Sequence, residues 1–261
     1  MADPMHQFEI HKVVDLPAIS VPGIGAIDLS ITNSTVSMLI AATLVVVFFA
    51  VATAKAAIVP GRMQVIGEGV FGYIDDLVAG IIGPEGRKFF PFVFTLFLFI
   101  LAMNVLGLFL VFTATSQLAV TASLAVMTML LVIGYGVLRN GANMYKLFVP
   151  AGIPWYMLIL VTPIEIISFV LRPVTLALRL FGNMLGGHVV MSLFGSFVVA
   201  LGIVGLSGGL ASLAFIPSVL SFGMIVALTG LELVVAILQA FVFTALATVY
   251  LNEVVNFGHG H

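Results

Sequence analysis

The sequence predicts an all-α polytopic membrane protein, and three observations point to that fold class. Hydrophobic residues make up 62% of the 261-residue chain. Charged residues make up only 8%, well below the roughly 25% that is usual in soluble proteins. The apolar residues also gather into runs of about 20, the length that one helical crossing of a bilayer needs. A water-soluble globule could not cover so much apolar surface with polar groups.

The elements can be assigned in order along the chain. The first apolar run, 36–54, is long enough to span a bilayer once. Between Pro60 and Pro84, apolar side chains recur at helical spacing among several charges, which predicts an amphipathic helix at the membrane interface. Two transmembrane helices follow, at 89–112 and 118–138. Residues 157–256 then form two much longer apolar stretches, which predict a hairpin of two long membrane helices.

Residues 1–33 are the most polar part of the chain, and we expect an extracytoplasmic segment that precedes one integral membrane domain, 34–261. The orientation follows from the basic residues, which concentrate in two connections on the same side of the membrane: Lys55, Arg62, Arg87 and Lys88 in one, Arg139 and Lys146 in the other. Because basic connections remain in the cytoplasm, the N-terminus is predicted to lie outside.

Several classes of function are excluded by what the sequence lacks. The net charge is −2 and no basic patch could neutralise phosphates, so we expect no nucleic-acid partner. The chain contains no cysteine, which excludes disulfides and thiolate chemistry. No phosphate-binding loop of the form G-x-x-x-x-G-K-[ST] occurs, so we expect no nucleotide site. We expect no cofactor and no metal; the final His259-Gly260-His261 is more consistent with a solvated tail.

The first arm of the long hairpin carries a polar stripe. Glu165, Arg172 and Arg179 are seven residues apart and therefore return to nearly the same helix face, with Asn183 one turn further on. Ionisable residues inside a bilayer cost roughly 2.5–3.5 kcal/mol each on the insertion scale, so they indicate function by default. The alternative for any one of them is a structural ion pair between helices.

The second arm carries matching polar residues, and they suggest one antiparallel register. The numbers of facing residues in such a pair add to a nearly constant value, and three pairs agree: Arg179 with Gln239, His188 with Glu232, and Glu165 with Glu253. The midpoint falls at Ser207-Gly208-Gly209, the best turn signal in the region. Each arm is longer than one bilayer crossing, so it either breaks into two spans or crosses at a steep tilt, with Gly186-Gly187 and Pro217 as possible kinks.

Two motifs resemble a known family. The first is Arg179-Leu180-Phe181-Gly182-Asn183-Met184, followed by Gly186-Gly187-His188, and the second runs from Leu238-Gln239-Ala240-Phe241 to Thr248-Val249-Tyr250-Leu251. They closely resemble subunit a of F-type ATP synthases, and the resemblance covers essentially the whole chain. It implies a stator beside a rotating ring of c subunits, with the hairpin facing that ring and two half-channels carrying protons to and from it.

The resemblance also implies roles for individual residues. Arg179 matches the arginine that separates the half-channels, and its neighbours Asn183 and Gln239 would orient it without neutralising it. The remaining residues divide between two half-channels: His188, Glu232 and Asn104 for the proton entrance, and Glu165, Arg172, Tyr250 and Glu253 for the exit. For Arg172, a structural role and a role in giving the exit a positive potential are equally open.

The arrangement of His188 and Glu232 resembles the mitochondrial and related bacterial members of the family. The expected location is the inner membrane of a bacterium, with the mitochondrial inner membrane as the less favoured alternative. The expected partners are the c-ring, subunit b or a peripheral stalk, lipid and protons. The chain would be a component of an ATP synthase without itself catalysing ATP chemistry.

Two other functional classes could explain charges inside the membrane. A secondary transporter usually shows two related halves, whereas the charge-poor C-terminal half of this chain does not resemble the N-terminal half. A stand-alone proton channel would have to connect the two half-channels, and a fixed arginine between them opposes that. Dependence of proton flow on c subunits distinguishes both alternatives from the stator.

Overall fold

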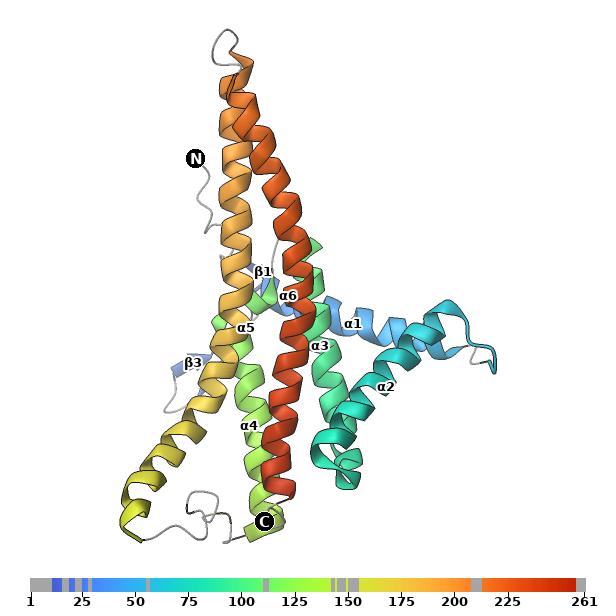
Figure 1. Cartoon of the computed structure of the whole chain (residues 1–261), viewed down its shortest axis with the longest axis vertical. Coiled ribbons are helices and arrows are strands. Elements are labelled where there is room, and N and C mark those ends of the chain that lie inside the picture. Colours follow the sequence, from blue (N-terminus) through green and yellow to red (C-terminus); the bar gives the residue numbers. More distant parts are fainter. Residues whose placement is uncertain are drawn as a thin grey trace. The chain divides into compact units, whose positions relative to one another are not determined.

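The computed structural model describes residues 11–15, 19–21, 25–27, 30–54, 57–109, 113–141, 144, 149, 155–207 and 213–256. In this part of the chain almost every residue is helical (Figure 1). Five helices are long and apolar enough to cross a membrane: α1 (Asn33–Ala54), α3 (Phe90–Phe109), α4 (Leu118–Asn140), α5 (Trp155–Leu206) and α6 (Phe215–Val255). The prediction of an all-α polytopic membrane protein is therefore confirmed.

The amphipathic helix expected between Pro60 and Pro84 is α2 (Arg62–Ile82). It is not among the membrane-spanning candidates, and it carries Glu68, Asp75 and Asp76 among its apolar residues. Two short 3-10 turns complete the helical part, η2 (Pro84–Lys88) after α2 and η3 (Ala114–Ser116) between α3 and α4.

The polar segment before α1 contains short strands, which its sequence pattern does not indicate. The strand β1 (Lys12–Val14) pairs antiparallel with β4 (Ile31–Thr32), and β2 (Ile19–Val21) pairs antiparallel with β3 (Gly25–Ile27). Residues 1–10, 16–18, 22–24, 28 and 29 of the expected 1–33 segment lie outside the described residues.

Each of the two long arms is one continuous helix and does not break into two spans. The 52 residues of α5 correspond to about 78 Å of helix at 1.5 Å per residue. Pro163 and Pro173 lie inside α5 without ending it, and the helix also continues through Gly186-Gly187. Pro217 lies in the first turn of α6, where a missing backbone N–H costs no helical hydrogen bond.

The chain divides into two compact units, which we call unit 1 and unit 2. Unit 1 contains Met1–Val46, Phe99–Gln117 and Phe181–Gln239, and unit 2 contains Val47–Leu98, Leu118–Leu180 and Ala240–His261. Unit 1 therefore holds the second half of α5 and the larger, first part of α6, together with the end of α3. Unit 2 holds α2, α4, the first half of α5 and the last part of α6.

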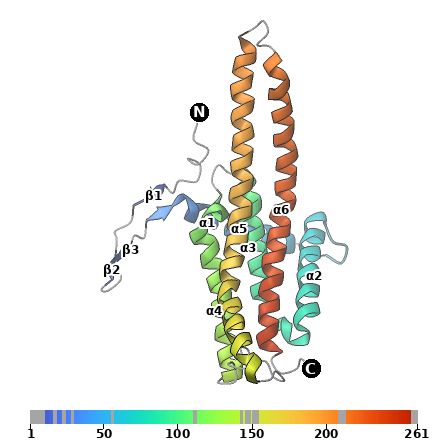
Figure 2. The same ribbon diagram turned by 60° about the vertical axis from the view of Figure 1, so that its left-hand side comes forward.

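In unit 1 the second half of α5 and the first half of α6 pack side by side and antiparallel (Figures 1 and 2). The Ser218 hydroxyl donates a hydrogen bond to the Val198 carbonyl at 3.0 Å. The ring of Phe215 packs closely against Gly205: a Cβ at this position would lie 2.9 Å from a ring carbon, so the contact requires a glycine. The connection lies between α5 and α6 as predicted, although Gly208 and Gly209 of the expected turn are outside the described residues.

In unit 2 the end of α6 is held by hydrogen bonds from two asparagines. The Asn140 amide at the end of α4 donates to the Val254 carbonyl at 3.0 Å, and the Asn256 amide donates to the Ile82 carbonyl of α2 at 2.9 Å. Arg139 forms a two-pronged ion pair with Glu85 of η2. These polar contacts close the end of an apolar core whose fully buried side chains include Ile74, Val93, Val132, Phe243 and Leu251.

Candidate functional site

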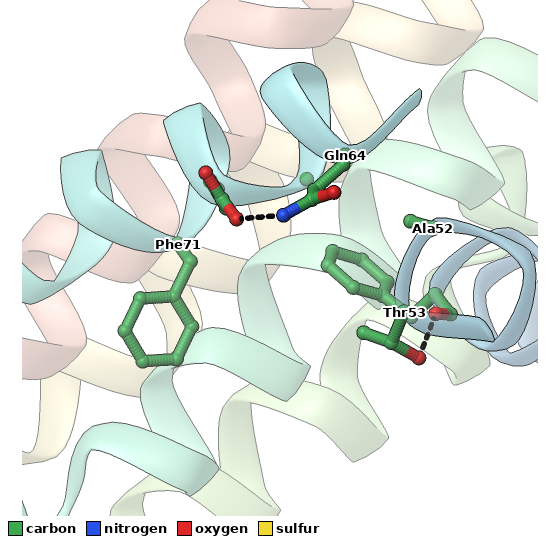
Figure 3. Close-up of a pocket in the computed structure, with 7 residues that line it drawn as sticks. Ala52, Thr53, Gln64 and Phe71 are labelled. Carbon is green, nitrogen blue, oxygen red and sulfur yellow. Dashed lines mark hydrogen bonds between the residues drawn. The ribbon is translucent and has the colours of Figure 1, made fainter. Parts of the chain in front are cut away.

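A pocket of about 150 Å³ lies between the second half of α1 and the start of α2 in unit 2 (Figure 3). Its walls are mostly apolar, and the amide of Gln64 closes one side by donating to Glu68 at 2.7 Å. Pockets for small molecules usually occupy about 300–1,000 Å³, so this one is too small for a typical cofactor. The residues that the sequence singles out lie elsewhere.

Five polar residues of α3, α5, α6 and the segment around η3 lie in unit 1, and we call them the entrance cluster: Asn104, Thr113, Thr115, His188 and Glu232. The Asn104 side chain is fully buried on α3. Its amide N–H donates to the Ala236 carbonyl of α6 at 3.2 Å, which links these two helices. Its Oδ1 atom is buried with no hydrogen bond to any described residue.

His188 lies on α5 and is half-buried. Its Nε2 atom is 2.9 Å from the Thr113 hydroxyl oxygen, and that hydroxyl also donates to the Gly107 carbonyl at 3.1 Å. The segment just before η3 therefore contacts the imidazole of α5 through the side chain of Thr113.

Glu232 has both carboxylate oxygens buried, and neither makes a hydrogen bond within the described part of the chain. The side chain lies against Gly187 of α5, because a Cβ at that glycine would come within 2.7 Å of the Glu232 Cδ atom. A buried carboxylate without a partner costs several kcal/mol, and a buried hydroxyl or amide oxygen without one costs roughly 1–3 kcal/mol. Asn104 Oδ1 and Thr115 Oγ1 are also buried without a hydrogen-bond partner among the described residues, so the cluster concentrates several costly polar atoms in one place.

Asn183 and Gln239 are directly bonded in unit 1. The Asn183 amide donates to the Gln239 Oε1 atom at 2.9 Å. Gln239 is 4% exposed, and its own amide nitrogen is buried without an acceptor among the described residues. The predicted register of α5 and α6 is therefore observed here to within about one turn.

Arg179 lies on the surface of α5, four residues before Asn183. It forms no ion pair with another described residue. Two apolar side chains of the same stretch of α5 are also exposed, Leu178 by 49% and Val174 by 45%. An arginine on an apolar helix face is costly to leave in lipid, so this face suits a polar or acidic partner.

Four residues of unit 2 that the sequence assigns to the exit lie around one guanidinium, and we call them the Arg172 cluster: Glu165, Arg172, Tyr250 and Glu253. Arg172 forms an ion pair with Glu253, and its Nη2 atom lies 3.7 Å from Glu165 Oε1. The guanidinium also lies over the Tyr250 ring, 4.9 Å from its centroid. The sequence pairs Glu165 with Glu253 directly, whereas in the structure each of the two acids forms an ion pair with Arg172, since two carboxylates repel each other.

Sequence reasoning misses the hydroxyl residues around η3. Thr113, Thr115 and Ser116 are almost fully buried, although between two apolar runs they look like an ordinary polar connection. The available signal is that three hydroxyl side chains occur within four residues, with no charge and no proline among them.

Comparison with known proteins decides the family. Residues 35–252 match the family model described as ATP synthase A chain. The chain belongs to the ATP synthase A chain family. This family member is 48% identical over 253 residues to the ATP synthase subunit a of Hyphomonas neptunium, covering 96% of this chain and 95% of that protein.

Two further relatives of this ATP synthase A chain family member cover almost the same length. The ATP synthase subunit a of Mesorhizobium japonicum is 44% identical over 261 residues, covering 98% of each chain. That of Maricaulis maris is 45% identical over 269 residues, covering 99% of this chain and 100% of the relative. The resemblance inferred from the two motifs is therefore confirmed.

Proposed function

We propose that the chain is the proton-translocating stator subunit of the ATP synthase membrane sector. It provides two offset half-channels and the arginine barrier between them, and so couples proton flow to rotation of the c-ring. The observation that carries this proposal is the entrance cluster, where a carboxylate and other polar atoms are buried without hydrogen-bond partners in the described chain. Family membership supports the same function.

The entrance half-channel is built from His188, Glu232 and Asn104. The ordinary pKa of an imidazole lies near neutral pH and that of a carboxylic acid lies below it, so the two groups together can take up protons and pass them inward. The unsatisfied oxygens of Asn104 and Glu232 offer acceptors to water or to a proton carrier. Such a chain of acceptors would lower the cost of moving a proton through an apolar helix pair.

Arg179 is the barrier between the half-channels. A guanidinium keeps its charge in a poorly solvated place, so it repels a proton that would leak straight across. It also favours the ionised form of a passing c-ring carboxylate, which then releases its proton. The bonded amides of Asn183 and Gln239 are neutral and leave the charge of the arginine available for the ring.

The exit half-channel involves Glu165, Arg172, Tyr250 and Glu253. The ion pairs of Arg172 with two carboxylates favour the structural role for this arginine over a free positive potential. In that role Arg172 holds α5 and α6 together within unit 2 and leaves a surplus negative charge on the two glutamates. A surplus negative charge attracts a leaving proton towards the water.

Family membership supports the proposed partners and location. The exposed face of α5 around Arg179 suits the carboxylate-bearing c-ring, and subunit b or a peripheral stalk would hold the chain against rotation. Lipid covers the remaining apolar surface. The relatives are bacterial, so the inner membrane of a bacterium is the proposed location.

Substitution of Arg179 tests the barrier. In the assembled complex, Arg179→Ala should abolish ATP synthesis driven by a proton gradient, because nothing then separates the half-channels. Synthesis and passive proton leak would be measured in the same vesicles, with Arg62→Ala on the exposed start of α2 as a control that should synthesise ATP normally. Coupled synthesis at the unsubstituted rate in Arg179→Ala would refute the barrier role.

A further inference from the structure

The Thr113 contact of His188 bears on the orientation of the imidazole and on which ring nitrogen carries the hydrogen. We infer that Thr113 is a positioning residue, which holds the His188 ring in place with Nε2 as the protonated nitrogen. The inference rests on the proposed function, since it assumes that His188 carries protons in the entrance half-channel. It adds a residue outside both long helices to that path.

The protonation of the ring follows from counting hydrogens. The Thr113 hydroxyl has one proton, and it donates this proton to the Gly107 carbonyl at 3.1 Å, since a carbonyl can only accept. The same oxygen lies 2.9 Å from His188 Nε2. It can therefore only accept there, which requires a hydrogen on Nε2. In the neutral ring, Nδ1 is then the basic nitrogen, which takes up a proton to form the imidazolium and gives the same proton back.

Thr113 is itself held firmly enough to act as a positioning residue. Its carbonyl accepts hydrogen bonds from the Ser116 hydroxyl at 2.6 Å and from the Ser116 backbone N–H at 3.2 Å. These bonds close the single turn of η3. The Thr113 side chain is 3% exposed, so water does not compete for the bond to His188.

Gly107 at the end of α3 makes the approach possible. A Cβ at this position would lie 2.9 Å from the Thr113 hydroxyl oxygen and 3.1 Å from the Thr113 Cβ. Any other residue would push the threonine away from the carbonyl that fixes its hydroxyl. The arrangement therefore depends on α3, on the segment before η3 and on α5 together.

The test uses ATP-driven proton pumping by the whole complex in membrane vesicles. Thr113→Val keeps the shape of the side chain and removes the hydroxyl, and we expect pumping to fall about fivefold, the scale of one orienting hydrogen bond. Thr113→Ser restores the hydroxyl and should pump within about twofold of the original rate. Thr128→Val is the matched control, because among the described residues this buried threonine donates its hydroxyl only to the Leu124 carbonyl of its own helix.

The amount of the chain retained in the purified complex would be measured for each variant. If Thr113→Val fails to assemble, Gly107→Ala replaces it, with the same expected loss. Pumping within about twofold of the original rate in the assembled valine or alanine variant would overturn the inference. Equal loss in the valine and serine variants, both fully assembled, would overturn it as well.

His188→Ala separates this inference from the proposed function. Loss of pumping in His188→Ala together with normal pumping in Thr113→Val would reject the positioning role and leave the entrance half-channel intact. Normal pumping in His188→Ala would instead reject the entrance role of the histidine, whatever Thr113 does.

Discussion

Gly187 shows how the absence of one side chain can determine where a charge lies. The Glu232 carboxylate occupies the space that a Cβ at residue 187 would need, with its Cδ atom 2.7 Å from that position. A glycine in a helix costs roughly 0.5–1 kcal/mol relative to alanine. At this position the cost is offset by the room it leaves for an acidic side chain between two packed helices.

Substitution of Gly187 should therefore impair proton translocation more than helix propensity suggests. We expect Gly187→Ala to lower proton pumping at least about tenfold, because the added Cβ overlaps the carboxylate and a misplacement of about 1 Å can already cost that much activity. Adding Glu232→Asp shortens the acidic side chain by one methylene and should recover part of the activity. Gly134→Ala is the control, since a Cβ there meets no atom of the described residues within 4 Å. Normal pumping in Gly187→Ala would contradict the argument.

At the scale of elements, α5 and α6 form the feature that depends most on register. Within unit 1 the side chains of Ser218 and Thr229 reach Val198 and Met191 of the opposite helix. An antiparallel pair that slipped by one turn would move His188 and Glu232 apart along the helix axis by about 5.4 Å. The function proposed for these two residues therefore requires this pairing.

Cysteine crosslinking measures that pairing directly. A Cβ at residue 202 would lie 3.7 Å from the Ser218 hydroxyl oxygen, the atom that the sulfur replaces in Ser218→Cys, so the two positions face each other closely enough for a disulfide. Gly202→Cys with Ser218→Cys should therefore crosslink under mild oxidation, as detected by a mobility shift after cleavage in the 207–214 connection. Gly195→Cys with Ser218→Cys lies two turns away and should not crosslink, and the reverse result would mean a different register.

At the scale of the whole molecule, the chain leaves much of its apolar surface uncovered. Large hydrophobic side chains on every membrane-spanning helix are exposed, and Arg179 is exposed among those of α5. A bilayer can cover the apolar part, but a charged guanidinium calls for a partner that carries carboxylates. The chain by itself is therefore expected to be an incomplete proton path.

Reconstitution separates the stator from the two alternatives. Purified and inserted into liposomes without c subunits, the chain should conduct no protons above the background of empty liposomes, because the path is interrupted at Arg179. Conductance would be followed with a pH-sensitive dye after a potassium diffusion potential is applied, and adding the ring should restore coupled proton flow. Robust conductance by the chain alone would favour a stand-alone channel or transporter.

The sequence by itself determined the fold class and the order of the helices, and it singled out most of the polar residues that contact one another in the long hairpin. Apolar run length and helical periodicity are local properties, so they can be recognised from the sequence without a structure. Seven-residue spacing placed Glu165, Arg172 and Arg179 on one face of α5. Counting residues from the turn paired Gln239 with Arg179, one turn away from Asn183, the residue to which Gln239 is bonded.

Tertiary structure alone decided which groups are bonded to one another. Arg172 lies between Glu165 and Glu253, although the sequence paired the two acids directly. The hydroxyl of Thr113 meets His188 from a residue 75 positions away, and Gly187 gives Glu232 its place. Such contacts join segments that are far apart in the chain, and their geometry depends on side-chain packing over a few ångströms, which no local pattern of residues encodes.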